Sequence, residues 1–112
     1  MELSVSGTGA ESFNGRWIPV VNVKFENVAA NEQWHKEGDE TKILVFWDRV
    51  SKPHWGICSS SGHGYYGNEQ DYNGGVPPKD GWKLCVGANS VQTWIDPSSE
   101  QIKEPGPVIE GI

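Results

Sequence analysis

The residues with the richest chemistry are the cysteines and histidines, and their spacing argues against a metal or nucleophile site. His54, Cys58 and His63 offer the imidazole and thiolate groups that zinc accepts. If His54 and Cys58 share one strand, four residues at ~3.3 Å each place their Cα atoms roughly 13 Å apart. A nucleophile pair of Cys58 with His63 or His35 is no better supported. We therefore expect satisfied polar side chains here, and no metal.

Other motifs that carry chemistry are incomplete. The chain has no Gly-x-Ser-x-Gly elbow. Gly7-Thr8-Gly9 lacks the third glycine of a dinucleotide fingerprint and the lysine of a phosphate loop, so it is better explained as a β-turn. Asp48 can be a perturbed acid at the end of an apolar run, but such residues more often cap a turn. Nothing fixes the separation of a carboxylate pair. The sequence predicts no enzyme and no cofactor.

The two cysteines leave two alternatives open. A disulfide between Cys58 and Cys85 would close a loop of 26 intervening residues and contribute roughly 3 kcal/mol. Alternatively, both are buried, reduced thiols that act as small apolar side chains. The first residues show no basic and apolar leader, which favours the reduced form and an intracellular location. The compartment itself is not determined.

Composition points to one small β domain. The 112 residues include 11 Val and 7 Ile but only 3 Leu and 4 Ala, which favours strands over a helical bundle. The 14 Gly and 7 Pro supply many turns. A net charge of −6 argues against a nucleic-acid partner, because such binders cluster Lys and Arg. The apolar runs are shorter than the ~20 residues of a membrane helix, so we expect no membrane insertion.

Short strands alternate with glycine-rich turns along the chain. The expected strands are residues 3–6, 16–25 with a break at Pro19, 42–48, 54–58, 65–66, 82–86 and 91–95. Residues 27–41 are ambiguous, with either one or two helical turns or a short strand around Trp34. This pattern predicts an all-β fold, a small antiparallel sandwich or barrel of about seven short strands. The domain would span residues 1–96, and residues 97–112 would form a Pro/Gly-containing tail.

The aromatic residues exceed what a small core needs, because each large ring buries ~150–250 Å². We assign Trp47, Trp55 and Trp82 to the core, with Ile43, Val45, Ile57 and Leu84. The rings left over are the predicted binding residues. They are Trp34, Tyr65, Tyr66 and Tyr72, with Asn68 beside them. Exposed Tyr and Trp on glycine-rich loops suit protein recognition or sugar stacking.

An ordered series of glycines, prolines and aromatics is similar to a known repeat. It comprises Val5-Ser6-Gly7-Thr8-Gly9, Asn14-Gly15-Arg16-Trp17, His54-Trp55-Gly56-Ile57, Gly64-Tyr65-Tyr66 and Pro77-Pro78-Lys79-Asp80-Gly81-Trp82. It resembles a small β-repeat module found in proteins of algae, oomycetes and other protists, over about residues 3–95. Trp17 stands where the module more often has Tyr. The resemblance implies a structural or binding module without catalytic residues.

Two functions from different classes follow. The first is a protein-interaction or architectural module that docks through its aromatic loops and its tail. Residues 101–112 would then lie across a neighbouring subunit as an extended strand, or else form a disordered terminus. The second is a carbohydrate-binding module that stacks sugars on these rings beside Asn68, Glu69 and Asp71. A small enzyme is a distant third.

Overall fold

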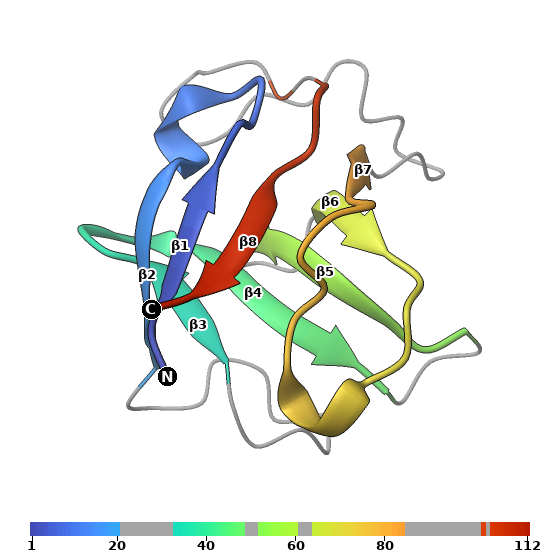
Figure 1. The fold of residues 1–112 in the computed structure, drawn as a ribbon. Helices are drawn as coiled ribbons and strands as arrows, with labels where there is room; N and C mark the ends of the chain where they lie inside the picture. The colour runs from blue at the N-terminus through green and yellow to red at the C-terminus, as the bar shows by residue number, and fades with distance from the viewer. Residues whose placement is uncertain (21–32, 49–51, 61–63, 85–101, 103) are drawn as a thin grey trace.

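Eight strands form one antiparallel sheet (Figure 1). The computed structural model describes residues 1–20, 33–48, 52–60, 64–84, 102 and 104–112. The strands are β1 (Leu3–Ser6), β2 (Gly15–Pro19), β3 (Trp34–Lys36), β4 (Asp39–Trp47), β5 (His54–Ser59), β6 (Gly64–Asn68), β7 (Lys83–Leu84) and β8 (Val108–Gly111). Two 3-10 turns, η1 (Glu11–Phe13) and η2 (Asn73–Gly75), accompany them. The described residues contain no α-helix, and the all-β prediction is confirmed.

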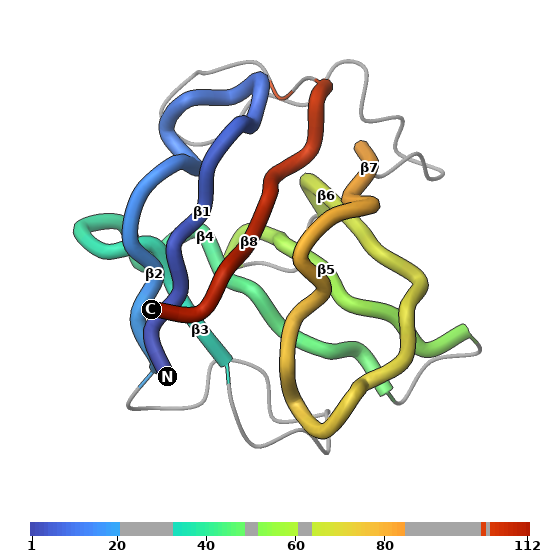
Figure 2. The backbone as a smooth tube through the Cα atoms, in the orientation of Figure 1, coloured from blue at the N-terminus to red at the C-terminus, as the bar shows by residue number. Residues whose placement is uncertain are grey.

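The sheet curls into a half-barrel. Its strand order is β7-β6-β5-β4-β3-β2-β1-β8, so each strand from β1 to β7 pairs with its neighbour in sequence and β8 returns beside β1. The Ile109 N–H donates to the Lys79 carbonyl oxygen at 2.8 Å, which ties β8 to the segment just before β7. Figure 2 shows these two segments passing close to one another. The two ends of the sheet therefore approach each other, as in the predicted small barrel.

Several sequence expectations on individual strands can now be resolved. The ambiguous stretch around Trp34 is a strand at Trp34–Lys36, and a turn at residues 37–38 leads into β4. The second strand ends at Pro19, which fits the missing N–H donor of proline. The expected strand at residues 91–95 and the expected strand continuations at 21–25 and 85–86 lie outside the described residues.

The prediction of a peripheral tail is wrong for the described part of residues 97–112. Val108–Gly111 forms β8, which pairs with β1 in the register Ser4↔Glu110 and Val5↔Ile109. Ile109 is 2% exposed and belongs to the core. The sequence did not predict this strand, because Pro and Gly surround the two apolar residues Val108 and Ile109. Two such residues are too short a run to indicate a strand. The predicted domain boundary at residue 96 lies outside the described residues.

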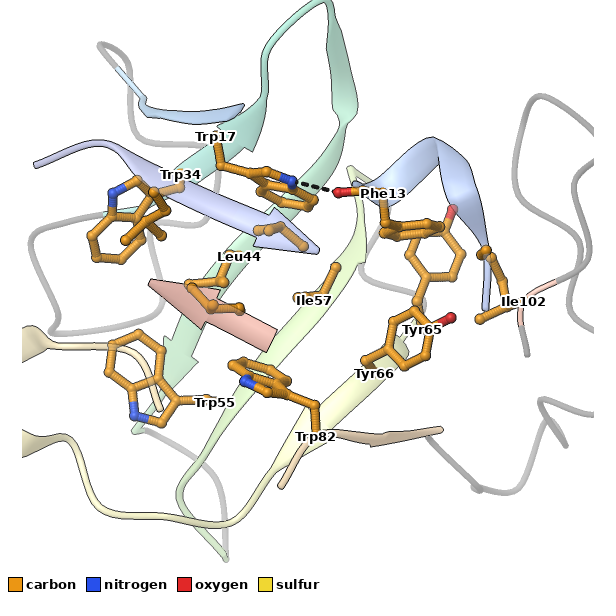
Figure 3. Close-up of a cluster of buried hydrophobic side chains, with 14 of the residues drawn as sticks. Phe13, Trp17, Trp34, Leu44, Trp55, Ile57, Tyr65, Tyr66, Trp82 and Ile102 are labelled. Atoms are coloured by element: carbon orange, nitrogen blue, oxygen red, sulfur yellow. Dashed lines mark hydrogen bonds between the residues drawn. The ribbon is translucent and has the colours of Figure 1, made fainter. Parts of the chain in front are cut away.

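The inner face of the curl holds the core. Alternate residues of the regular strands point inward, and the paired residues Leu3 and Trp17, Leu44 and Trp34, and Phe46 and Trp55 meet there. Figure 3 shows the rings of β2, β3, β5 and β6 filling this interior. Its buried members are Leu3, Val5, Ala10, Phe13, Trp17, Trp34, Leu44, Phe46, Trp55, Ile57, Tyr65, Tyr66, Trp82, Ile102 and Ile109, with Leu84 packed against them.

The unbroken apolar run of β4 is buried on both faces, as predicted from its lack of alternation. Leu44 and Phe46 face the inner core, whereas Val45 joins Cys58 in a second buried cluster. Trp47, which we assigned to the core, is half-buried and packs against that second cluster. Among the described residues, no helix is long and apolar enough to span a membrane.

Candidate functional site

Three of the predicted binding residues are buried in the core, so the expectation that they are exposed is wrong. Trp34 is 0% exposed, and its indole N–H donates to the Met1 carbonyl oxygen at 2.7 Å. Tyr65 and Tyr66 are 2% and 0% exposed. Successive residues of a regular strand point to opposite faces, but the pairing of β5 with β6 skips Tyr65. This bulge turns both tyrosines inward, where each meets the Phe13 ring edge-on.

Tyr72 is the predicted binding ring that stays accessible, at 37% exposure. It lies in the loop of residues 69–82 that joins β6 to β7, here called the β6–β7 loop. Its ring stacks on Trp55 with 6.0 Å between centroids and 10° between planes, and it also contacts Phe46. One face of the ring is thus covered by the core, and the ring is held in place.

Asn68, the fifth predicted binding residue, has a different task. It is 5% exposed, and its Oδ1 accepts the Gln70 N–H at 3.1 Å while its Nδ2 donates to the Asp80 carbonyl at 2.9 Å. These bonds join the two ends of the β6–β7 loop. Asn68 therefore positions the loop and turns its amide toward the protein. Its place in a glycine-rich stretch indicated that Asn68 lies beside a loop, but not that its side chain positions that loop.

Two core tryptophans anchor the same loop. The Trp55 indole N–H donates to the Asp71 carbonyl at 3.0 Å, and the Trp82 indole N–H donates to the Pro78 carbonyl at 2.8 Å. Between these anchors, η2 turns through left-handed backbone at Asn73 (φ 51°), Gly74 and Gly75. Asparagine and glycine adopt this region more readily than other residues, which explains their use here.

The outer side of the β6–β7 loop is hollowed. The hollow measures about 550 Å³, and its lining consists mainly of polar side chains on the loop. The lining residues are Glu69, Gln70, Asp71, Asn73, Val76 and Pro78. Tyr72 lies between two of them in sequence but is not part of the wall. Lys52 pairs with Glu69 at 3.1 Å, and both side chains are about 70% exposed.

An ion pair with one buried member lies elsewhere, between Asp39 and Lys42 of β4. Lys42 is 1% exposed; its Nζ lies 2.5 Å from Asp39 Oδ2 and 5.1 Å from the centre of the Phe13 ring. Burial raises the pKa of Asp39, but hydrogen bonds from Lys42 and Thr41 outweigh it and lower that pKa below its ordinary value. The sequence reasoning missed this pair, although strand alternation places Lys42 on the inner face with Leu44.

The described residues first considered for metal chemistry, His54 and Cys58, do not form a ligand cluster. His54 and Cys58 lie on β5 four positions apart, and His54 Nδ1 lies 2.9 Å from the Lys52 carbonyl oxygen. Within the described part of the chain, no three His, Cys, Asp or Glu residues gather as a metal site would require. Cys58 is buried, as expected for an apolar thiol. Cys85 and His63 lie outside the described residues, so the disulfide alternative stays a prediction. Asp48 follows β4 and is half-buried.

Comparison with known proteins finds no relative: no family model, no curated protein and no solved structure matches the chain. The resemblance to the algal and oomycete repeat module therefore stays a prediction, and the function must be argued from the site.

Proposed function

We propose that this chain is a non-catalytic binding module whose contact surface is the β6–β7 loop. The observation that carries the proposal is a ring held in place, Tyr72, next to a hollow of about 550 Å³. The side chains that line it include both hydrogen-bond acceptors and donors.

The way the loop is held supports this proposal. Asn68, Trp55 and Trp82 fix its ends and middle by hydrogen bonds, whereas its exposed side chains are mostly polar, apart from Tyr72 and Val76. A loop that is ordered before binding loses little conformational entropy when a ligand docks. Rigidly positioned loops with polar outward residues are where binding function is commonly located.

A protein-interaction or architectural role was expected to use four aromatic side chains. With three of them buried, Tyr72 alone remains of that surface. Protein interfaces take most of their energy from a cluster of anchors, so one ring gives weak support for a large protein interface. The same loop is nevertheless a candidate surface for a protein or a carbohydrate ligand, and both kinds of ligand are offered in the experiment that follows.

Two double variants test whether the loop is the contact surface. Glu69→Gln with Asp71→Asn removes two negative charges from the hollow, and Glu40→Gln with Glu110→Gln removes two from exposed positions on β4 and β8. Each immobilised chain is incubated with protein and polysaccharide extracts of cells that express it. The proposal expects a retained ligand that the control variant keeps and the loop variant loses. Equal retention by all three chains would contradict it.

A further inference from the structure

We propose that the ligand of the β6–β7 loop is a neutral oligosaccharide. This inference rests on the proposed function, because it names the chemical class that the loop recognises. It follows from three features of the loop: the fixed ring, the mixture of polar groups in the hollow and the sign of the charge there.

The Tyr72 ring is suited to stacking against a sugar. Trp55 supports it from one side at an interplanar angle of 10°, and the ring is 37% exposed. The face of an aromatic ring is electron-rich, so it attracts the weakly positive C–H groups on the flat side of a pyranose. The ring is held by Trp55 and Phe46, which means that stacking does not have to fix a mobile side chain.

The hollow offers hydrogen-bond groups that match hydroxyls. Glu69 and Asp71 carry carboxylates, which only accept, whereas Gln70 and Asn73 carry amides, which both donate and accept. A sugar hydroxyl both donates and accepts, so it can pair with either kind of group. A wall of this composition is suited to a ligand with many hydroxyls.

The charge of the wall selects against acidic sugars. The described residues that line the hollow include two carboxylates and no Lys or Arg. Lys52 approaches Glu69 from outside the wall and is largely exposed, so it offsets only part of this negative charge. A uronic acid or sulfated sugar would still meet like charge, which disfavours binding. A neutral sugar meets no such penalty.

The layout calls for more than one sugar unit. Tyr72 is flanked in sequence by the wall residues Asp71 and Asn73, but its ring is not part of the wall. A ligand that stacks on the ring and also enters the hollow makes contacts in two places on the loop. A chain of two or more pyranoses meets this condition, whereas a monosaccharide occupies one position at a time.

Titration calorimetry and saturation-transfer NMR on the full chain test the inference. The neutral probes are cellohexaose, laminarihexaose and chitohexaose, and hexagalacturonate is the anionic probe. We expect at least one neutral probe to bind with a Kd of about 1 mM or tighter, and hexagalacturonate to bind at least roughly 10-fold more weakly. Absence of binding by all three neutral probes, or binding of hexagalacturonate as tight as theirs, would overturn the inference.

Variants locate the binding. Tyr72→Phe keeps the ring and should stay within about 3-fold of wild-type affinity, whereas Tyr72→Leu should lose about 10-fold or more. Tyr72 also packs on the core, so thermal unfolding is recorded to show that each variant folds. Asp71→Asn perturbs the hollow without touching the core and should also weaken binding, whereas the Glu40→Gln and Glu110→Gln control should not. Unchanged affinity in both Tyr72→Leu and Asp71→Asn would refute the site.

This experiment can fail separately from the proposed function. If no neutral probe binds but the double variant of Glu69 and Asp71 still loses a ligand retained from extracts, the loop is a contact surface for another class of ligand. If that loop-dependent retention is also absent, both proposals fail.

Discussion

The interior of the curled sheet and the β6–β7 loop use aromatic residues in opposite ways. In the interior, Trp17 is fully buried and its indole N–H is satisfied locally by the Phe13 carbonyl at 2.9 Å. At the loop, Trp55 and Trp82 bury their rings in the same core but donate their N–H groups to loop carbonyls. The comparison shows that an indole can serve the core and position a surface loop at once.

This division explains why counting rings overestimated the number of exposed aromatic side chains. The buried rings stabilise the fold by removing apolar area from water, while Tyr72 is the outermost ring of a stack that begins inside. Changes in the interior should therefore affect stability first, and changes in the loop should affect binding with little loss of stability.

The largest effect is expected from deleting residues 108–112. The deletion removes β8 from β1 and uncovers the core where Ile109 packs. A buried Ile contributes ~1.5–3 kcal/mol, and the lost strand pairing adds to this, out of a typical total of about 5–15 kcal/mol. We expect loss of the cooperative thermal transition measured by circular dichroism. Ile112→Ser, at a side chain that is 71% exposed, is the control and should unfold as wild type does. A deletion variant with wild-type thermal stability would show that β8 is peripheral after all.

Trp17→Ala is expected to produce the next largest effect. It removes a fully buried ring and the bond to the Phe13 carbonyl, and such changes cost about 3–5 kcal/mol of unfolding free energy. Urea denaturation should show a clearly smaller loss for Tyr72→Ala, whose ring is partly exposed. Equal losses for the two variants would break the distinction between interior and loop.

Asp39→Asn tests the ion pair between the half-buried Asp39 and the buried Lys42. Lys42 would keep its buried charge and lose the Asp39 carboxylate, and we expect a loss of about 1–3 kcal/mol at pH 7. The pKa of Asp39 is lower in the folded state than in the unfolded state, where it is near 3.8. The stability that the ionised Asp39 contributes is therefore fully present above the unfolded pKa. This stability is lost as the pH falls through the lower pKa of the folded state. Urea denaturation at a series of pH values should therefore show the gap between wild type and variant closing below about pH 4. A gap that does not narrow as the pH falls below the unfolded pKa of Asp39 would exclude ionisation of Asp39 as its cause.

The sequence allowed most of the strands to be predicted because their pattern is local. The run from Ile43 to Trp47 indicated a strand buried on both faces, and turn residues marked its neighbours. By contrast, β8 depends on pairing with β1, more than 100 residues earlier in the chain. No local pattern predicts such a pairing.

The site was harder to predict than the fold for a similar reason. Exposure of Tyr65 depended on a bulge in β6, which shifts one residue between faces and leaves no clear mark in the sequence. Tyr72 and Asn68 were found through their glycine-rich surroundings. Asn68, unlike Tyr72, does not face solvent, because its amide bonds to the Asp80 carbonyl. The sequence does not show this contact across the loop.

The smallest effect on stability is expected at the loop itself, from Lys52→Ala. Lys52 and Glu69 form an ion pair at 3.1 Å with side chains that are 73% and 70% exposed. Exposed pairs contribute about 0–1 kcal/mol, because water and salt screen the charges and two long side chains must be held still. Urea denaturation should place Lys52→Ala within about 0.5 kcal/mol of wild type, and added salt should reduce even that difference.

The Lys52→Ala variant also makes the hollow more negative. It should therefore weaken the binding of hexagalacturonate further and leave the binding of a neutral hexasaccharide unaffected. A stability loss as large as that of Asp39→Asn would mean that the loop, like the interior, is part of what holds the fold together.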